Sequence, residues 1–214
     1  MKYRKLVENA KKPNGFWGKM MIKAMNKGHS SLTSWGLEHM NIERTATVLD
    51  IGCGGGKTVD RLCSIVANGK VYGIDYSELS VKSSEKLNSK NILCNKAKIL
   101  QVSVSDMPFD DNTFDNITAV ETYYFWPDKE NDVKEVFRVL KQGGTVMLLF
   151  EMLRTDDDPF KWEKVENMLN IKSVTPQEIR AVLESAGFEN INTYTKEGTT
   201  WLCATAQKPK DDEN

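Results

Sequence analysis

The sequence predicts an α/β fold in which helices cover a mostly parallel sheet. Three observations carry this prediction. From residue 46 onward short apolar runs alternate with amphipathic stretches, a glycine-rich turn follows the first apolar run, and two β-rich runs lie near the end of the chain. Alternation of this kind is typical of βα units. The 214 residues suit one domain with a small addition.

Five apolar runs are the candidate strands of the parallel part of a Rossmann-like sheet. They span residues 47–51, 71–75, 99–104, 114–120 and 145–150. Helical patterns lie between them at 57–67, 77–87 and 128–140. Turn signals such as Asn68-Gly69 and Gly143-Gly144 follow these helices, so each unit has a marked end.

The pattern changes after residue 150. Residues 156–159 predict a loop, and residues 160–170 predict a short insertion helix. The run Thr175-Pro176-Gln177-Glu178 combines a capping box with a proline in the first turn, which predicts a helix that ends at Gly187. Residues 188–194 and 200–206 then predict an antiparallel hairpin at the sheet edge.

The first 45 residues stand outside the alternation. Phe16, Trp17, Met20, Met21, Ala24 and Met25 recur at helical spacing, and residues 31–40 predict a second helix with Trp35 and Leu37 facing inward. These helices are either structural cover for the sheet or a lid over a ligand cleft. We therefore expect a helical lid over 1–45, a main domain over 46–208 and a charged tail over 209–214.

Composition narrows the partners. With 29 Lys and Arg against 30 Asp and Glu, the formal charge is -1, so no global field attracts nucleic acid or an anionic membrane. No apolar run approaches the roughly 18 residues of a membrane span, and we expect a cytoplasmic protein without membrane insertion. The four cysteines are widely spaced and the two histidines lie ten residues apart, which predicts neither a disulfide framework nor a metal site.

The most informative stretch runs from Val48 to Thr58, V-L-D-I-G-C-G-G-G-K-T. Its glycines permit positive φ and let backbone N–H groups approach a ligand at the end of the first strand. A phosphate loop would need glycine where the chain has Ile51, and the dinucleotide pattern would need glycine where it has Lys57. A triphosphate and NAD are thus disfavoured, and a plain strand-to-helix turn stays open.

Acidic residues at the strand ends make the predicted class of ligand more specific. Asp75 ends the second strand, where a carboxylate can accept hydrogen bonds from both ribose hydroxyls. Asp50 precedes the glycine turn and suits a ligand amino group. Asp106 follows the third strand, where it can accept from an adenine amino group while Met107 covers the ring. Each residue alone is also typical of a turn or a solvated charge, but together they favour a nucleoside ligand with an amino group.

These stretches resemble the class I S-adenosylmethionine-dependent methyltransferases, specifically the small-molecule type similar to the ubiquinone and menaquinone methyltransferases. V-L-D-I-G-C-G-G-G matches the family's first motif, V-Y-G-I-D-Y-S its second, and V-S-D-M-P-F-D-D-N-T-F-D the segment between its third and fourth strands. R-V-L-K-Q-G-G departs from the usual R-V-L-K-P-G-G at Gln142. The resemblance covers residues 46–150 and implies seven strands in the order 3-2-1-4-5-7-6, with strand 7 antiparallel.

The resemblance also implies roles for individual residues toward S-adenosylmethionine. The methionine portion would meet the backbone of Gly52, Cys53 and Gly54, with Asp50 supporting its amino group directly or through water, and with Glu121 beneath the methionine and sulfonium. The adenosine portion would meet the remaining residues of the set, which are Asp75 on the ribose, Tyr76 packed on adenine, and Ser105, Asp106 and Met107 around its edge. The product would be S-adenosylhomocysteine.

A sulfonium methyl group is already activated, so the main tasks of the protein are alignment of the acceptor and exclusion of water. His29 is a candidate base for an acceptor that must lose a proton, and a surface or capping histidine is the alternative. The segment 121–127, E-T-Y-Y-F-W-P, follows the fourth strand. Its aromatic residues, Tyr124 among them as a candidate catalytic residue, would hold a flat or apolar acceptor or would simply pack as a loop.

The sequence therefore predicts a methyltransferase acting on a small-molecule acceptor. Segment 121–127 is not the [DNS]-P-P-[YFW] pattern of enzymes that methylate adenine or glutamine nitrogen, and no basic cluster accompanies it, which disfavours nucleic acid. An RNA or protein methyltransferase and a non-catalytic regulatory protein that binds S-adenosylmethionine are the alternatives. The oligomeric state is left open.

Overall fold

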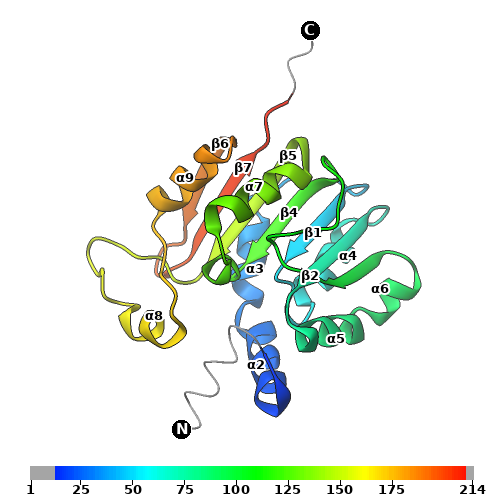
Figure 1. The fold of residues 1–214 in the computed structure, drawn as a ribbon, viewed down its shortest axis with the longest axis horizontal. Coiled ribbons are helices and arrows are strands. Elements are labelled where there is room, and N and C mark those ends of the chain that lie inside the picture. Colours follow the sequence, from blue (N-terminus) through cyan, green and yellow to red (C-terminus); the bar gives the residue numbers. More distant parts are fainter. Residues whose placement is uncertain (1–12, 211–214) are drawn as a thin grey trace.

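The computed structural model describes residues 13–210, apart from the side chains of Lys23 and Lys27. Within this range seven strands form one sheet in the order β3-β2-β1-β4-β5-β7-β6, as predicted (Figure 1). The strands are β1 Thr47–Ile51, β2 Lys70–Asp75, β3 Ala97–Gln101, β4 Phe114–Val120, β5 Leu140–Phe150, β6 Glu189–Thr195 and β7 Leu202–Gln207. β7 pairs antiparallel with both β5 and β6, and the other pairs are parallel.

Helices cover both faces of the sheet (Figure 1). They are α2 Gly15–Gly28, α3 Ser30–Leu37, α4 Lys57–Ile65, α5 Glu78–Leu87, α6 Ser89–Leu93, α7 Lys129–Val139, α8 Glu163–Leu169 and α9 Pro176–Ser185, with a 3₁₀ turn η1 at Tyr123–Phe125. Leu148 of β5 packs in the cluster under α7 and α9, whereas Met147 and Leu149 pack in the cluster under α3. This is the alternation of facing that a strand buried on both sides requires.

The two N-terminal helices differ in how they pack. Leu32 of α3 is 1% exposed and packs against Met147, Leu149 and Cys203. α2 lies further out, with Phe16 71% exposed. α3 is therefore part of the core, and α2 is an outer element. Residues 1–12 of the expected lid and 211–214 of the expected tail lie outside the described residues.

Most predicted elements are present with shifted ends. The third strand ends at Gln101 rather than at residue 104, because its register with β2 stops where Asp75 pairs with Gln101. β5 begins at Leu140 rather than at residue 145, and a bulge at its pairing with β4 accommodates the two glycines. The short helix α6 was not predicted. The capping box at α9 is confirmed, since Thr175 and Glu178 accept hydrogen bonds from each other's backbone N–H.

No helix between residues 13 and 210 combines the length and apolar character needed to cross a membrane.

Candidate ligand-binding site

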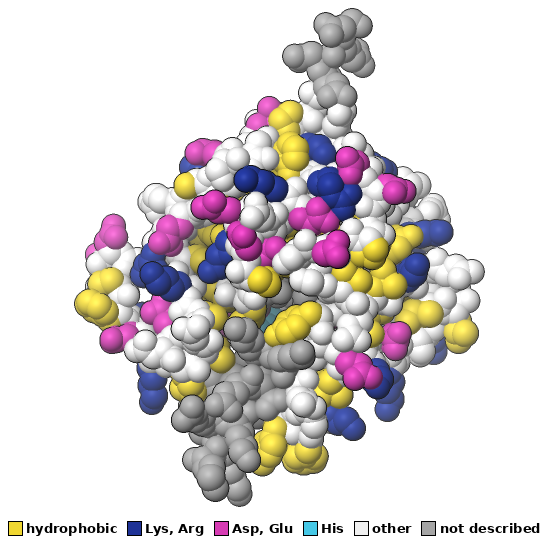
Figure 2. Space-filling view, viewed as in Figure 1, with side chains coloured by type: hydrophobic (Ala, Val, Ile, Leu, Met, Phe, Trp, Pro, Cys, Tyr) yellow, Lys and Arg dark blue, Asp and Glu magenta, His cyan; other side chains and the backbone are white. Residues whose placement is uncertain are grey.

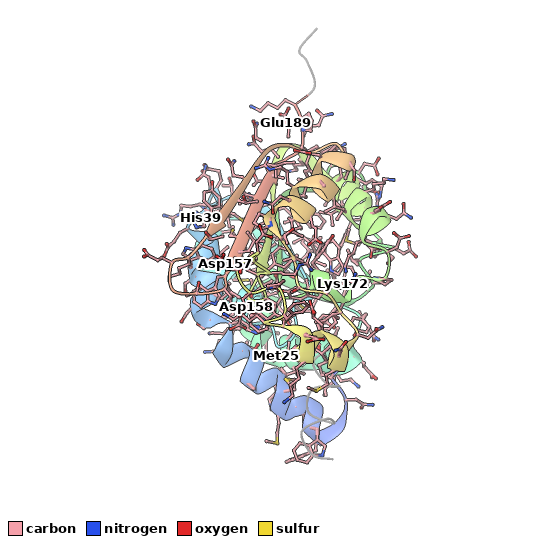
Figure 3. The ribbon with its side chains drawn as sticks, turned by 90° about the vertical axis from the view of Figure 1, so that its left-hand side faces the viewer. Met25, His39, Asp157, Asp158, Lys172 and Glu189 are labelled. Carbon is pink, nitrogen blue, oxygen red and sulfur yellow. The ribbon has the colours of Figure 1, made fainter. Side chains whose placement is uncertain are left out.

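A cavity opens at the carboxyl ends of β1, β2 and β4, where α2 and α3 face the glycine turn. It encloses about 870 Å³ of space, its open mouth included, and its wall combines the α2–α3 junction with residues 52–55, 75–76, 120–122 and 125. Figure 3 shows α2, marked by Met25, in the lower part of the molecule, below the loop that carries Asp157 and Asp158. Carboxyl ends of parallel strands are the usual place for a ligand in an α/β sheet.

The glycine turn is built for close approach. Gly52 has φ +68° and Gly54 has φ +50°. A Cβ on Gly52 would lie 2.1 Å from Thr122 Oγ1, so the protein itself requires glycine there. Among the described residues, a Cβ on Gly54 would meet nothing nearer than a carbonyl oxygen at 3.9 Å, although Gly54 lines the cavity. The space beside Gly54 therefore belongs to the cavity and is free for a ligand.

Asp75 ties the turn to the end of β2. Its carboxylate accepts hydrogen bonds from the N–H of Gly54 at 2.9 Å and from the N–H of Ser77 at 2.8 Å. The side chain is buried, and this burial raises the pKa of the carboxyl. Its orientation is thus fixed by backbone donors before any ligand binds.

Asp50 is a buried carboxyl with an unused acceptor. One oxygen accepts a hydrogen bond from the hydroxyl of Thr118 at 2.8 Å, and the other, Oδ2, has no partner among the described residues. Burial raises the pKa of Asp50 to about 7, and the negative charge of Asp75 adds to this shift. An unpaired buried acceptor that lines a cavity calls for a donor, and preferably a cation, from the ligand.

Glu121 is the second carboxyl of the cavity wall with a strongly raised pKa. It directly follows β4 with φ +58°, and its carboxylate accepts the N–H of Glu151 and the hydroxyl of Tyr124, the latter at 3.5 Å. Burial raises the pKa of Glu121 to about 8, and the charge of Glu151 adds to it. Tyr124 lies behind this carboxylate and accepts the N–H of Met152 at 3.0 Å.

His29 stands at the junction of α2 and α3 and also lines the cavity. Its Nε2 lies 3.7 Å from Oε2 of Glu151. Burial lowers the pKa of His29, and the charge of Glu151 opposes this shift. Sequence reasoning missed Glu151, although it follows β5 as Glu121 follows β4, on neighbouring parallel strands whose ends meet at one edge.

The structure brings together most of the residues that the sequence singled out. The cavity wall contains His29, Asp50, Gly52, Cys53, Gly54, Asp75, Tyr76 and Glu121. It also contains residues that sequence reasoning did not find, such as Asn26, Thr33 and Arg61. Asn26 and Thr33 come from α2 and α3, whose placement over the turn no local pattern reveals, whereas Arg61 lies on the predicted helix after the turn.

Four predicted residues do not line the cavity. Ser105 and Asp106 are exposed in the segment after β3, and the side chain of Met107 is 3% exposed in the core under α7 rather than free to cover a ring. Tyr124 is buried behind Glu121. Met107 is drawn inward because its N–H binds Glu135 and its carbonyl binds Arg138.

Cys53 lines the cavity, but its side chain is not suited to act as a nucleophile. Its thiol is buried and donates to Ser84 Oγ at 3.8 Å. Burial and the nearby carboxylates raise the pKa of the thiol well above its ordinary value. A thiolate nucleophile is disfavoured at this position.

Comparison with known sequences identifies methyltransferases. A family model described as a methyltransferase domain matches residues 49–148. An uncharacterized methyltransferase of Bacillus subtilis, YdaC, is 27% identical over 85% of this chain and 93% of its own length. A ubiquinone/menaquinone biosynthesis C-methyltransferase of Cronobacter sakazakii is 30% identical over 73% of this chain and 72% of its own length. A sterol 24-C-methyltransferase of Pneumocystis carinii is 27% identical, and the match spans 42% of its length.

Solved structures share the fold. A SAM-dependent methyltransferase from Aquifex aeolicus superposes with a TM-score of 0.67 at 22% identity, over 86% of this chain and 95% of that one. The phosphoethanolamine N-methyltransferase 2 of Haemonchus contortus, in complex with S-adenosylhomocysteine, gives a TM-score of 0.74 at 13% identity, over 91% of this chain and 58% of that one.

Proposed function

Because this chain belongs to the class I S-adenosylmethionine-dependent methyltransferases, we propose that its cavity holds this cofactor against the glycine turn and a small-molecule acceptor beside it, under α2 and α3. The enzyme class and the cofactor follow from the family.

The wall of the cavity fits the cofactor. The unpartnered Oδ2 of Asp50 and the carboxyl of Glu121 suit a ligand with an ammonium and a sulfonium. Asp75 is oriented by two backbone N–H groups and keeps acceptor capacity for ribose hydroxyls. The space beside Gly54 admits the amino-acid portion. When bound, S-adenosylmethionine supplies an electrophilic methyl group on a positively charged sulfur.

The adenine contacts are proposed on the family resemblance. Tyr76 lies on the cavity wall and is 38% exposed, and we assign its ring to stacking on adenine. Ser105 and Asp106 lie on the exposed segment after β3, and Asp106 is available there as an acceptor for the adenine amino group. Met107 is left out of these contacts, because its side chain is in the core and its N–H and carbonyl already bind Glu135 and Arg138.

Enclosure of the cavity favours a small acceptor, and it is the observation that carries this part of the proposal. α2 and α3 contribute Ile22, Met25 and Thr33 to the wall, and Phe125 faces them from η1. On the face shown in Figure 2, acidic and basic side chains are interspersed, whereas a polyanion needs a basic stripe. The named relatives that act on quinones and sterols support the same class of acceptor.

The chain's own residues would orient the reactants and exclude water. Backbone donors fix the carboxylate of Asp75, and the hydroxyl of Thr118 fixes that of Asp50, so the cofactor meets groups already in place. We propose that α2 closes the cavity and that the N-terminal region over 1–45 chooses the acceptor. The main domain over 46–208 would then supply the cofactor site.

Isothermal titration with S-adenosylmethionine tests the cofactor site, and the absence of binding at millimolar ligand to folded protein would refute it. The acceptor is tested by release of S-adenosylhomocysteine in a screen of small phenols, hydroquinones, sterols and amines, with tRNA and a peptide mixture as comparison. Turnover only with the macromolecules would refute the small-molecule assignment. Cofactor binding with no turnover in any arm would favour a regulatory protein.

A further inference from the structure

His29, Glu121 and Glu151 converge from three separate elements beside the α2–α3 junction. His29 comes from the α2–α3 junction, and the two glutamates directly follow the neighbouring strands β4 and β5. One ligand atom from each of the three lies within 4.8 Å of the others. His29 and Glu121 face the cavity. No mechanism described above uses Glu151.

We propose that His29 accepts a proton from the acceptor and that Glu151 positions and stabilises it in this role. The acceptor is then a molecule that carries a proton on the atom to be methylated, such as a phenol, a hydroquinone or a protonated amine. This inference rests on the proposed methyl transfer and deepens it by naming the acceptor chemistry.

The geometry suits a base that is neutral before the reaction. His29 makes no hydrogen bond between its ring and any described residue, and burial lowers its pKa, so the imidazole is free to take a proton at neutral pH. A distance of 3.7 Å to Glu151 is too long for a hydrogen bond but short enough for an ion pair. The ion pair forms once the imidazole is charged, so Glu151 stabilises the product of proton transfer.

Glu121 and Arg61, the other charged groups near His29, are engaged by other partners. This leaves Glu151 to stabilise the charged imidazole. The carboxylate of Glu121 accepts two hydrogen bonds, from the N–H of Glu151 and from Tyr124, so it is already engaged by groups other than His29. From α4, the guanidinium of Arg61 donates to the carbonyl and hydroxyl of Ser30 and to Ser34. Arg61 therefore fixes the start of α3 next to His29 rather than pairing with either glutamate.

The step balances without a further reactant. The bond from the acceptor atom to hydrogen breaks, the proton passes to a ring nitrogen of His29, and the electron pair left on the acceptor forms the bond to the methyl carbon. The carbon–sulfur bond breaks with its pair staying on sulfur, which gives S-adenosylhomocysteine. The imidazolium beside Glu151 then loses its proton to water. Two glutamates beside His29 also disfavour an acceptor that arrives as an anion.

Proton NMR offers a direct test, because the chain has only two histidines and each gives one C2–H resonance. In Glu151→Gln we expect the pKa of His29 to fall by roughly 1 unit, since a facing negative charge is removed. His39, stacked on Tyr194 at 4.0 Å, is the internal reference and should not move. Glu163→Gln on α8 is the matched control for loss of an exposed glutamate. An unchanged pKa of His29 in Glu151→Gln overturns the positioning role.

Kinetics with the best acceptor of the screen provide the second readout. We expect His29→Gln to lower kcat about 100-fold or more. Glu151→Gln should lower it roughly 3- to 10-fold and move the rising limb of the pH profile to lower pH, while Glu151→Asp restores part of the rate. The affinity for S-adenosylmethionine should be unchanged in all three variants. A lost cofactor affinity would mean that the groups bind cofactor, and a normal rate in His29→Gln would overturn the base.

The same three ligand types also suit a divalent cation, so metal binding is tested separately. Selective broadening of the His29 resonance by CoCl₂, together with loss of activity in EDTA, would overturn the assignment of His29 as a base. The three residues would then be a metal site. We expect full activity in EDTA. Failure of all acceptors in the screen would count against the proposed function, while the NMR titration would still decide whether Glu151 acts on His29.

Discussion

Two glycines of the turn are required for different reasons. Thr122 leaves no room for a side chain at Gly52, whereas Gly54 faces the cavity. We expect Gly52→Ala to destabilise the fold, since its Cβ has no room and its φ is positive. Gly54→Ala should cost only about 1–2 kcal/mol for the left-handed conformation but should abolish measurable cofactor binding. Thermal unfolding and titration with S-adenosylmethionine separate the two effects, and normal cofactor affinity in Gly54→Ala would contradict the assignment of this space.

Asp75 is the residue on which we expect the cofactor to depend most directly. Asp75→Ala should weaken binding of S-adenosylmethionine by about 1–3 kcal/mol, because charged hydrogen bonds to the ribose are lost. Asp157→Ala, in the exposed loop before α8, is the control for removal of an acidic residue. Titration calorimetry on both variants decides the point. Equal affinities would refute the ribose assignment.

The carboxyl groups of the cavity couple cofactor binding to pH. In the free protein burial raises the pKa of Asp50 to about 7 and that of Glu121 to about 8. A bound cation favours their ionised forms, so binding should release protons at pH 7 and should tighten between about pH 6 and pH 8. Calorimetry in phosphate and Tris buffers measures the release, and Asp50→Asn should reduce it. Binding heats that do not depend on the buffer would contradict this coupling.

The same raised pKa values determine whether the stability of the free protein rises or falls with pH. Both folded pKa values lie above the ordinary values of 3.8 and 4.5. The contribution of each group to the free energy of unfolding is therefore complete below its ordinary pKa and is lost as pH rises through its folded pKa. We expect the unfolding temperature of the free protein to fall between about pH 5 and pH 8, and S-adenosylmethionine to reduce that fall. Scanning calorimetry with and without ligand checks both statements.

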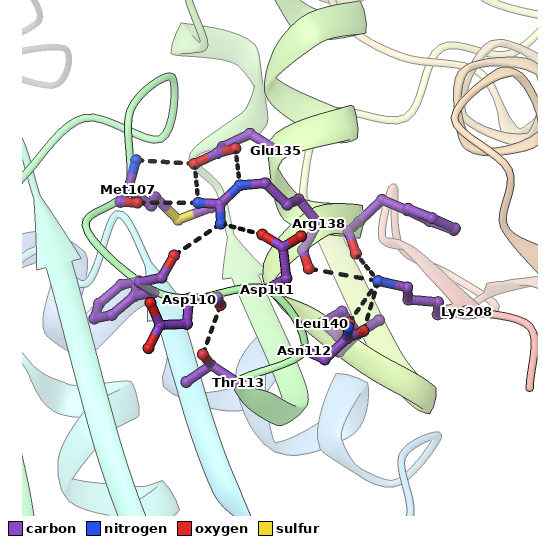
Figure 4. A network of polar contacts seen from close by, with 11 residues as sticks. Met107, Asp110, Asp111, Asn112, Thr113, Glu135, Arg138, Leu140 and Lys208 are labelled. Carbon is purple, nitrogen blue, oxygen red and sulfur yellow. Dashed lines mark hydrogen bonds and ion pairs between the residues drawn. The ribbon is translucent and has the colours of Figure 1, made fainter.

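At the scale of elements, Arg138 of α7 holds the segment after β3 in place. Its guanidinium donates to the carbonyls of Met107 and Phe109 and to the carboxylates of Asp111 and Glu135 (Figure 4). This network holds a segment without regular structure against α7. The motif R-V-L-K thus fixes a segment about 30 residues earlier in the chain.

We expect Arg138→Ala to lower the free energy of unfolding by about 1.5–3 kcal/mol, since bonds to charged partners are lost. Arg138→Lys should recover little of this free energy, because an ammonium group cannot replace the planar guanidinium with its several donors in fixed directions. The control is Arg180→Ala on α9, which within residues 13–210 has one ion pair, the exposed one with Glu184 at 3.9 Å, worth about 0–1 kcal/mol. Urea unfolding measures all three variants, and equal losses for Arg138→Ala and Arg180→Ala would contradict the network's importance.

Elements with a strong local signal were predictable from the sequence, and elements set by pairing were not. β1 and β4 match their apolar runs, and the capping box marks the start of α9. The end of β3 depends on its register with β2, and the start of β5 depends on a bulge opposite β4. Those features arise between strands distant in the sequence, where periodicity along one strand carries no information.

In the candidate site, the sequence shows which strand ends have acidic or aromatic side chains. It does not show which of these side chains face the cavity. Asp50 and Asp75 follow from their positions at parallel strand ends, and Glu121 follows from the family resemblance. The inward turn of Met107 depends on the distant Arg138, and the approach of His29 to Glu151 depends on how α3 packs. These are tertiary contacts between separate elements, so no local motif specifies them.

At the scale of the whole molecule, the N-terminal helices join the core through α3 and extend over the cavity through α2. We expect Leu32→Ala to cost about 2–5 kcal/mol, because this side chain is fully buried against Met147 and Leu149. Met20→Ala on α2 should cost less than about 0.5 kcal/mol, because Met20 is 47% exposed. Urea unfolding of both variants, followed by both fluorescence and far-UV circular dichroism, tests this contrast. A Leu32→Ala protein whose sheet unfolds at the urea concentration of the unmodified protein would mean that α3 is a detachable lid, whereas coincident early unfolding in both signals would make it part of one cooperative core.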